Sequence, residues 1–310
     1  MNSYEVVIKA IEFNGPERVP LQFSDLGYVD IEDIPLRESW TFNHPGCSGR
    51  DEWGCYWTIP EGIRGIGRVT GHPLSDWENF DTYEFPEPQL PPLDRRKMEK
   101  LKGKKYLAGS VPFTLFERMH FLRGFKNLLV DMYLRKDRIK LLADKVLQVQ
   151  IELVKQWAEY EADGIFMTDD WGTTDRLFIR PELWREIFKP RYKRLFDEIH
   201  RRGMHTIMHS DGCIIDIVPD WIEVGLDVLH NPSIRTLFGI REFGEAFGGK
   251  ICIFTGVDAM STLVYGTKEE IFQEVKEIIS AFGRFNGGLI AGWPNPQDTI
   301  ALRVPLKNIK

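Results

Sequence analysis

Acidic and histidine residues follow several short apolar segments of this sequence, at the point where each segment ends. Asp169 and Asp170 follow one such segment, and His209 and Asp211 follow the next. Because side chains alternate along an extended chain, His209 and Asp211 are expected on the same side. That spacing suits chelation of a metal ion, and Cys213 continues it if the chain stays extended.

Each of these groups also has a structural interpretation. Adjacent acids such as Asp169 and Asp170 often cap the next helix. One of two neighbouring carboxylates must nevertheless face inward, where it can hold a proton, a metal or a cationic group. His209 is compatible with a metal ligand and with a simple hydrogen bond to a neighbouring carboxylate. We take Asp170 and His209 as the catalytic candidates, supported by Asp169.

Further residues in loops or at segment ends are candidates for binding a substrate. Four of the nine tryptophans fall in loops and not on helical faces. They serve either as packing under long loops or as an aromatic lining for a methylated or aromatic ligand. The substrate-binding candidates are Asp25, Trp53, Trp171, His230, Asp258 and Trp293.

Apolar segments alternate with helical patterns along most of the chain, and this alternation positions the candidates. Helices are expected over 139–160, 181–202 with a kink at Pro190, 214–223, 239–246 and 267–282. Strands are expected over 19–22, 106–109, 164–167, 206–208, 227–229, 251–254 and 288–291. Strict alternation indicates an α/β protein with a parallel sheet, closed as a (β/α)8 TIM barrel in which one strand is not recognised.

In such barrels the active site lies at the carboxyl ends of the strands. The acids, histidines and tryptophans collect there, so we expect them to converge on one mouth and the protein to be an enzyme. Residues 37–83, rich in Trp, Gly and Pro, form a long N-terminal loop excursion. Four prolines in 84–94 forbid a helix there. We expect one domain over 1–310.

Composition excludes several classes of protein. With 43% hydrophobic and 28% charged residues the chain is globular, and its net charge of −6 with no long basic block argues against nucleic acid as a partner. No apolar run is long enough for a membrane span and no signal-peptide pattern is present, so we expect no membrane. Four scattered cysteines without a CxxC pair indicate a cytoplasmic location.

Several stretches together resemble the uroporphyrinogen decarboxylase superfamily. They are GPERVP at 15–20, DDWGT at 169–173, IRPELWREIFKP at 179–190 and HSDG at 209–212. The resemblance covers nearly the whole chain and implies the TIM barrel already inferred. The segment 305–310 is similar to the opening of the closing helix of the barrel.

Within that superfamily the chain resembles the cobalamin-dependent methyltransferase branch. True decarboxylases of the family carry an arginine-rich segment after the first strand, whereas residues 21–27 contain Asp25 and no arginine. In thiol-directed methyltransferases a zinc site uses a His-x-Cys motif and a later Cys. This sequence matches the histidine at His209 but has Asp211 in place of the cysteine, and 291–294 contains no cysteine. What remains, with RDEWG at 50–54, is similar to members that demethylate methoxy or methylamino compounds.

The resemblance implies transfer of a methyl group from a small methylated donor to the corrinoid of a partner protein. A Zn²⁺ ion would be held by His209 and Asp211, with the third ligand from Cys213, Asp170 or Asp258. A decarboxylase or other lyase acting on a small carboxylic acid is the alternative, and a noncatalytic ligand-binding barrel is a third interpretation. The oligomeric state stays open.

Overall fold

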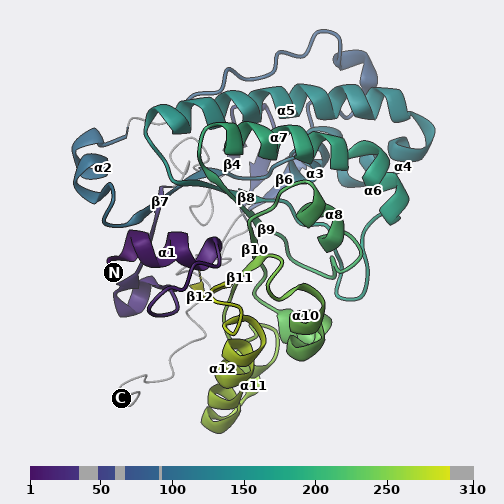
Figure 1. The fold of residues 1–310 in the computed structure, drawn as a ribbon. Coiled ribbons are helices and arrows are strands. Elements are labelled where there is room, and N and C mark those ends of the chain that lie inside the picture. Colours follow the sequence, from purple (N-terminus) through teal and green to yellow (C-terminus); the bar gives the residue numbers. More distant parts are fainter. Residues whose placement is uncertain (35–47, 60–66, 91–92, 294–310) are drawn as a thin grey trace.

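The computed structural model describes residues 1–34, 48–59, 67–90 and 93–293 of the chain. Within them, a curved sheet is surrounded by helices (Figure 1). Its strands run in the order β2-β1-β12-β11-β10-β9-β8-β7-β3, and every neighbouring pair except β1 and β2 is parallel. Their bounds are β1 (Leu21–Phe23), β2 (Tyr28–Val29), β3 (Ile31–Ile34), β7 (Tyr106–Val111), β8 (Gly164–Thr168), β9 (His205–His209), β10 (Val228–His230), β11 (Cys252–Thr255) and β12 (Leu289–Trp293).

Asp30 joins the two ends of this sheet. Its backbone N–H donates to Leu21 O (3.0 Å), and its carbonyl accepts from Tyr106 N (3.2 Å). The sheet is therefore nearly closed, which confirms the α/β TIM barrel. The strand that sequence patterns did not reveal is β3, which pairs in parallel with β7.

The helices outside the barrel follow the apolar periodicity of the sequence. The clearest is α12, which begins with the expected capping box of Thr267 and Glu270. The helices among the described residues are α1 (Ser3–Ile11), α2 (Arg95–Leu101), α3 (Phe116–Arg123), α4 (Phe125–Leu134), α5 (Lys136–Glu159), α6 (Pro181–Ile187), α7 (Lys189–Arg201), α8 (Val218–Glu223), α9 (Ile234–Phe238), α10 (Ile240–Phe247), α11 (Thr262–Tyr265) and α12 (Lys268–Phe282), with 3-10 turns η1 (Ser24–Leu26) and η2 (Trp77–Asn79).

Two helix boundaries are set by proline. The segment expected over 181–202 is divided at Phe188 into α6 and α7, next to Pro190. The helix expected from Ile214 begins only at Val218, so that expectation was wrong by one turn. Pro219 lies in the first turn of α8, where its missing N–H costs no hydrogen bond.

One end of the barrel is closed by α1. Val7 and Ile11 of this helix are buried in the core inside the barrel, against side chains from the strands such as Tyr106, Ile207 and Val228. The backbone at Ala10 also accepts a hydrogen bond from Gly288 N (2.8 Å), just before β12. Among the described residues, α1 therefore blocks approach of a ligand to the barrel interior from this end.

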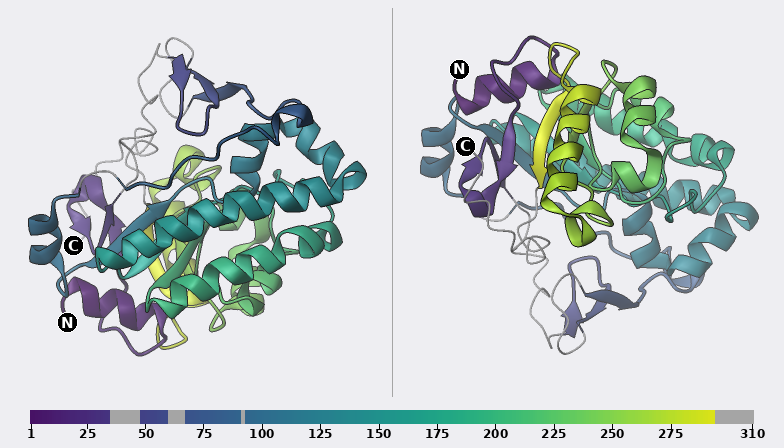
Figure 2. Two further views of the ribbon diagram at one scale, coloured as in Figure 1. Left: turned by 90° about the horizontal axis from the view of Figure 1, so that it is seen from above. Right: turned by 90° about the horizontal axis from the view of Figure 1, so that it is seen from below.

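The other end carries a small antiparallel sheet of β4 (Ser48–Arg50), β5 (Tyr56–Thr58) and β6 (Arg68–Gly71). Figure 2 shows it across the barrel from α1. Asp51 organises it, accepting from Cys55 N (2.8 Å) and Trp57 Nε1 (2.8 Å). The same carboxylate pairs with buried Arg118 of α3 at 3.3 Å. The described part of the loop excursion predicted over 37–83 thus contains strands, and Asp51 connects it to α3.

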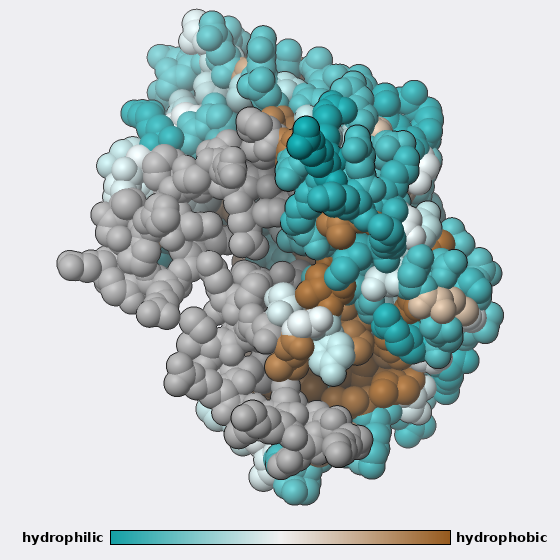
Figure 3. All heavy atoms as spheres, turned by 90° about the vertical axis from the view of Figure 1, so that its left-hand side faces the viewer, coloured by the Kyte–Doolittle hydropathy of each residue, from teal (hydrophilic) through white to brown (hydrophobic). Residues whose placement is uncertain are grey.

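One face of the molecule combines polar and apolar areas. Where the face in Figure 3 is coloured, it is mainly hydrophilic, with hydrophobic residues gathered in one hollowed area. No helix among the described residues is long and apolar enough to cross a membrane.

Candidate active site

The register of the strands brings the carboxyl ends of β8, β9 and β10 together, as expected for a barrel. Thr168 of β8 is paired with His209 of β9, which is paired in turn with His230 of β10. All three residues end their strands. Because side chains alternate, His209 and His230 lie on the inner side, two positions beyond buried residues of the inner core, Ile207 and Val228.

The same alternation separates the two adjacent acids. Asp169 is fully buried on the outer side and accepts hydrogen bonds from Leu115 N, Phe116 N and Glu117 N at 2.8–3.0 Å. It also accepts from the hydroxyl of Tyr192. These bonds hold the first turn of α3. Burial raises the pKa of Asp169 to about 6, against the lowering effect of these donors.

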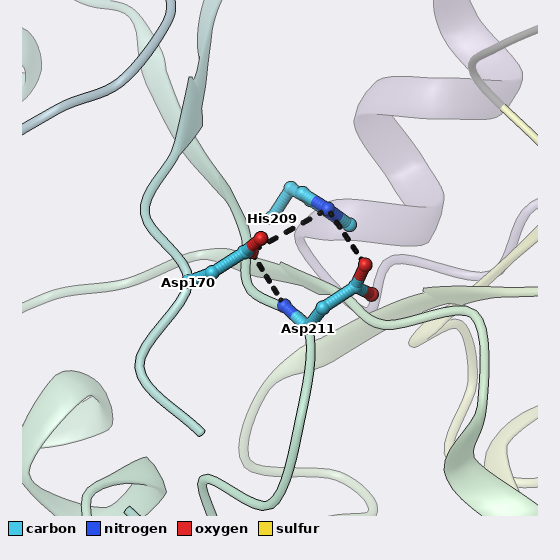
Figure 4. Close-up of side chains that lie close together, drawn as sticks. All are labelled: Asp170, His209 and Asp211. Atoms are coloured by element: carbon cyan, nitrogen blue, oxygen red, sulfur yellow. Dashed lines mark hydrogen bonds and ion pairs between the residues drawn. The ribbon is translucent and has the colours of Figure 1, made fainter. Parts of the chain in front are cut away.

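Asp170 faces the mouth, where it meets His209 and Asp211 (Figure 4). Its Oδ1 accepts from Asp211 N (2.8 Å) and lies 3.8 Å from His209 Nε2. Oδ2 of Asp211 lies 3.8 Å from the same nitrogen. One ligand atom from each of the three residues fits within 4.8 Å of the others.

This geometry fits a divalent metal ion. In a tetrahedral zinc site, ligand atoms about 2.1 Å from the ion lie about 3.4 Å from one another. The carboxylate oxygens of Asp170 and Asp211 lie 3.8 Å from His209 Nε2, which is close to that spacing. Three protein ligands leave one position for a substrate or water, as in catalytic sites. The donor set of two carboxylates and one imidazole is harder than a thiolate set, so it also suits metals other than zinc.

His230 lies behind His209. Their Nδ1 atoms are 2.7 Å apart, and His230 is buried with 2% of its surface exposed. Burial, and then the nearby His209, hold the pKa of His230 well below its usual value. His230 is therefore a neutral ring that contacts the cluster from inside the barrel, and its predicted role in substrate binding stays a prediction.

Glu117 is a site residue that the sequence patterns missed. It lies in the first turn of α3, and its Oε2 accepts from Thr168 Oγ1 (3.2 Å). Burial raises the pKa of Glu117 well above its usual value, and the charges of Asp170 and Asp169 raise it further. Glu117 therefore holds its proton more tightly than an ordinary glutamate does.

Cys213 is not part of the cluster, whose third member is Asp170. Gly212 has φ +82° and turns the chain after Asp211, so the alternation that predicted Cys213 is interrupted. The backbone N–H of Cys213 donates instead to Thr173 O (2.6 Å).

Three other predicted residues are occupied by contacts within the protein. Trp171 is fully buried, stacks on Phe116 with ring centroids 4.4 Å apart, and donates to Tyr192 Oη (2.9 Å). Trp53 is buried with the guanidinium of Arg118 4.7 Å from its ring centroid.

Asp258 is also fully buried, and its oxygens accept from Thr236, Met260 and Ser261. For it, as for Trp53 and Trp171, substrate binding stays a prediction. The side chains of Asp25 and Trp293 lie outside the described residues.

Comparison with known proteins adds three findings. Residues 63–310 match the family model described as uroporphyrinogen decarboxylase (URO-D). The uroporphyrinogen decarboxylases of Bacillus cereus (strain B4264) and Bacillus anthracis are each 26% identical over 174 residues, 53% of this chain and 49% of theirs. The chain thus spans about half the length of the curated relatives it matches. A methyltransferase from Methanosarcina mazei shares the fold, with a TM-score of 0.69, 15% identity, and coverage of 97% of this chain and 96% of that one.

Proposed function

Because the chain belongs to the uroporphyrinogen decarboxylase family, we propose that it is a methyltransferase that acts at the mouth of the barrel. It takes a methyl group from a small methoxy or methylamino donor to the corrinoid of a partner protein. The observation that carries this proposal is the cluster of Asp170, His209 and Asp211 at the carboxyl ends of β8 and β9. The whole-chain fold match to a methyltransferase is compatible with it.

The cluster would hold a divalent ion, with zinc as the first candidate. When bound, such an ion supplies Lewis acidity that stabilises negative charge on the oxygen or nitrogen losing its methyl group. Asp170 is held for this role by the N–H of Asp211. His209 is held by its contact with His230.

Glu117 would move a proton in this reaction. A carboxyl group whose pKa is raised well above its usual value keeps its proton at a pH where ordinary carboxyl groups are ionised, so it can donate to the departing oxygen or nitrogen. Its carboxyl group is hydrogen-bonded to Thr168, the residue that is paired with His209 at the end of the neighbouring strand.

The charge at the mouth bears on the choice of substrate. The cluster contributes two carboxylates, and the nearby cation Arg118 is buried and paired with Asp51. A divalent ion held by the cluster would offset these two negative charges, so the site would be close to neutral and compatible with a neutral methoxy or methylamino compound.

Decarboxylation of a small carboxylic acid is the second candidate. The curated relatives with matching sequence are decarboxylases. A protonated Glu117 could also give its proton to the carbon that loses carbon dioxide.

Two measurements on protein purified without chelator separate these activities. Elemental analysis should find about one zinc or similar divalent ion per chain. Reduced cobalamin, supplied as the methyl acceptor with a panel of methoxy-aromatic compounds and methylamines, should be methylated, which its absorption spectrum reports. Release of carbon dioxide from small carboxylic acids, without methylation of cobalamin by any donor, would contradict the proposal.

A further inference from the structure

A glutamine on the inner side of the barrel uses only half of its side-chain amide. Gln22 is the middle residue of β1 and has 5% of its surface exposed. It is paired with Gly292, two positions beyond Ile290 of the inner core, so its side chain lies on the inner side as well. Its Oε1 accepts a hydrogen bond from Ile31 N (3.1 Å).

This hydrogen bond determines which way the amide points. A backbone N–H needs an acceptor, so the amide oxygen must face Ile31 and the NH2 group must face away from it. Nε2 of Gln22 has no hydrogen-bond partner among the described residues. The enclosed side-chain atoms that lack a partner do not include it, so this nitrogen is reached by solvent. The one accessible polar group of Gln22 is therefore a donor.

Gln22 and His209 lie on opposite sides of the barrel. From β1, strand β9 is the fourth strand through β12, β11 and β10, and also the fourth through β3, β7 and β8. Both residues are close to the carboxyl ends, since His209 ends β9 and only Phe23 follows Gln22 in β1. With α1 across the other end, a ligand reaches Nε2 from the mouth. A small molecule bound there meets the candidate metal site on one side and an amide donor on the other.

Gly292 holds β1 in place next to this amide. It has φ +154°, and an added Cβ would lie 2.2 Å from the backbone oxygen of Gln22. Only glycine lets β12 approach β1 this closely without displacing it. Glycine also adds no side chain to the inner side of the barrel next to the amide.

We propose that Gln22 is the specificity-determining residue of this site and donates from Nε2 to an oxygen of the methyl donor. An amide NH2 group can only donate, so it requires an atom with a lone pair. The ether oxygen of a methoxy compound has one, whereas the nitrogen of a protonated methylamine has none. Gln22 therefore selects methoxy compounds over methylamines, and this inference rests on the function proposed above.

The expected selectivity follows from the cost of leaving the donor unmatched. A site that donates a hydrogen bond to its ligand rejects analogues without the acceptor, because the polar group then loses its water and gains nothing. For a neutral amide and an ether oxygen this amounts to about 10-fold in affinity.

Binding of ligand pairs to protein purified without chelator tests the inference, with no cobalamin present. Methoxybenzene is compared with ethylbenzene, and methoxyethanol with butanol, so that CH2 replaces the ether oxygen within each pair. Ligand-observed NMR titration should give a Kd about 10-fold lower for the methoxy member, and weaker binding of trimethylammonium. Equal Kd values within both pairs, tightest binding of trimethylammonium, or binding of no methoxy compound would overturn the inference.

Gln22→Met supplies the second test. It keeps the length of the side chain but removes the donor, so the two Kd values of each pair should come within about 2-fold of each other. Damage to the barrel would weaken both members alike, so the ratio separates selection from structure. Gln150→Met, at a buried glutamine of α5 outside the barrel, is the matched control and should keep the preference. A preference that persists in Gln22→Met would contradict the role of Gln22.

The methyl-transfer assay keeps this inference separate from the proposed function. Selective binding of methoxy compounds that is lost in Gln22→Met, without methylation of cobalamin, would refute the function and leave the inference standing. Methylation of cobalamin by methylamines, at equal rates in Gln22→Met and the original protein, would refute the inference alone.

Discussion

The two ends of β9 carry the same residue in opposite situations. His205 begins the strand and His209 ends it, four positions apart, so both side chains face the inside of the barrel. His205 lies at the end closed by α1, where its Nδ1 is 3.2 Å from the hydroxyl of Tyr106. His209 lies at the open end, beside two carboxylates and a second histidine.

The comparison shows that position along the barrel axis, more than residue type, decides what a histidine can do. At the closed end, burial lowers the pKa of His205, and Tyr106 donates to Asp163 O (3.1 Å). Asp163 accepts in turn from Leu107 N (2.8 Å). That end is a network of internal hydrogen bonds under a helix. At the open end, ligand atoms of three residues instead lie within 4.8 Å of one another.

The largest difference should appear when each histidine is replaced by alanine. His209→Ala removes one of three ligand atoms, so Zn²⁺ affinity should fall on the order of 1,000-fold, given about 10–16 kcal/mol for a full zinc site. His205→Ala should leave the Kd within about 2-fold. Isothermal titration with Zn²⁺ measures both. If His205→Ala reduced the zinc affinity as much as His209→Ala does, zinc binding would not depend on the open end of the barrel alone.

A smaller contrast is expected between the adjacent acids. Asp170→Asn removes a charge at the mouth, so methyl transfer should fall about 100-fold while the unfolding midpoint stays nearly unchanged. Asp169→Asn should instead lower the free energy of unfolding by about 2 kcal/mol, because the amide NH2 would face backbone donors of α3. Steady-state kinetics and urea unfolding of both variants provide the comparison. Full activity of Asp170→Asn would assign this residue to structure.

The last contrast concerns pH and Glu117. The folded protein binds this proton more tightly than the unfolded chain, because the pKa is raised from its ordinary value of 4.5. Stability contributed by the protonated group is therefore lost as the pH rises above 4.5, by up to about 1.4 kcal/mol per pH unit until the folded pKa is passed. Glu117→Gln should lack this loss, so its advantage should grow with pH in urea unfolding.

Glu269→Gln, at an exposed position in the first turn of α12, is the control that reports how loss of a surface carboxylate alone changes the unfolding curve. If Glu117→Gln runs parallel to the original protein from pH 5 to 8, Glu117 is ionised in the fold. It could then not donate a proton in the way proposed here.

The strand ends could be predicted from sequence, whereas the partners across strands could not. Short apolar runs followed by polar residues placed His209 and His230 at the mouth, as the structure confirms. Their contact depends on the register between β9 and β10, which no local pattern specifies. The sequence also could not show which of Asp169 and Asp170 faces inward. Phe166 and Met167 before them are both apolar, so either could face the inside of the barrel.

The remaining differences have local causes. Cys213 was placed by assuming an extended chain, but Gly212 adopts a left-handed conformation that ends the alternation. Glu117 gave no signal, since its partner Thr168 is distant in sequence and belongs to another element. In the excursion, strands of three or four residues are too short to produce a recognisable period.

The closure of the barrel has a consequence for biosynthesis. Leu21 in β1 pairs with Ala291 in β12, and Ala10 in α1 accepts from Gly288 beside that last strand. A ribosome adds about 5–20 residues per second, so β1 and α1 wait on the order of tens of seconds before these partners exist. During that interval the edge of β1 and the apolar face of α1 are exposed, and both are surfaces that chaperones would be expected to protect in the growing chain.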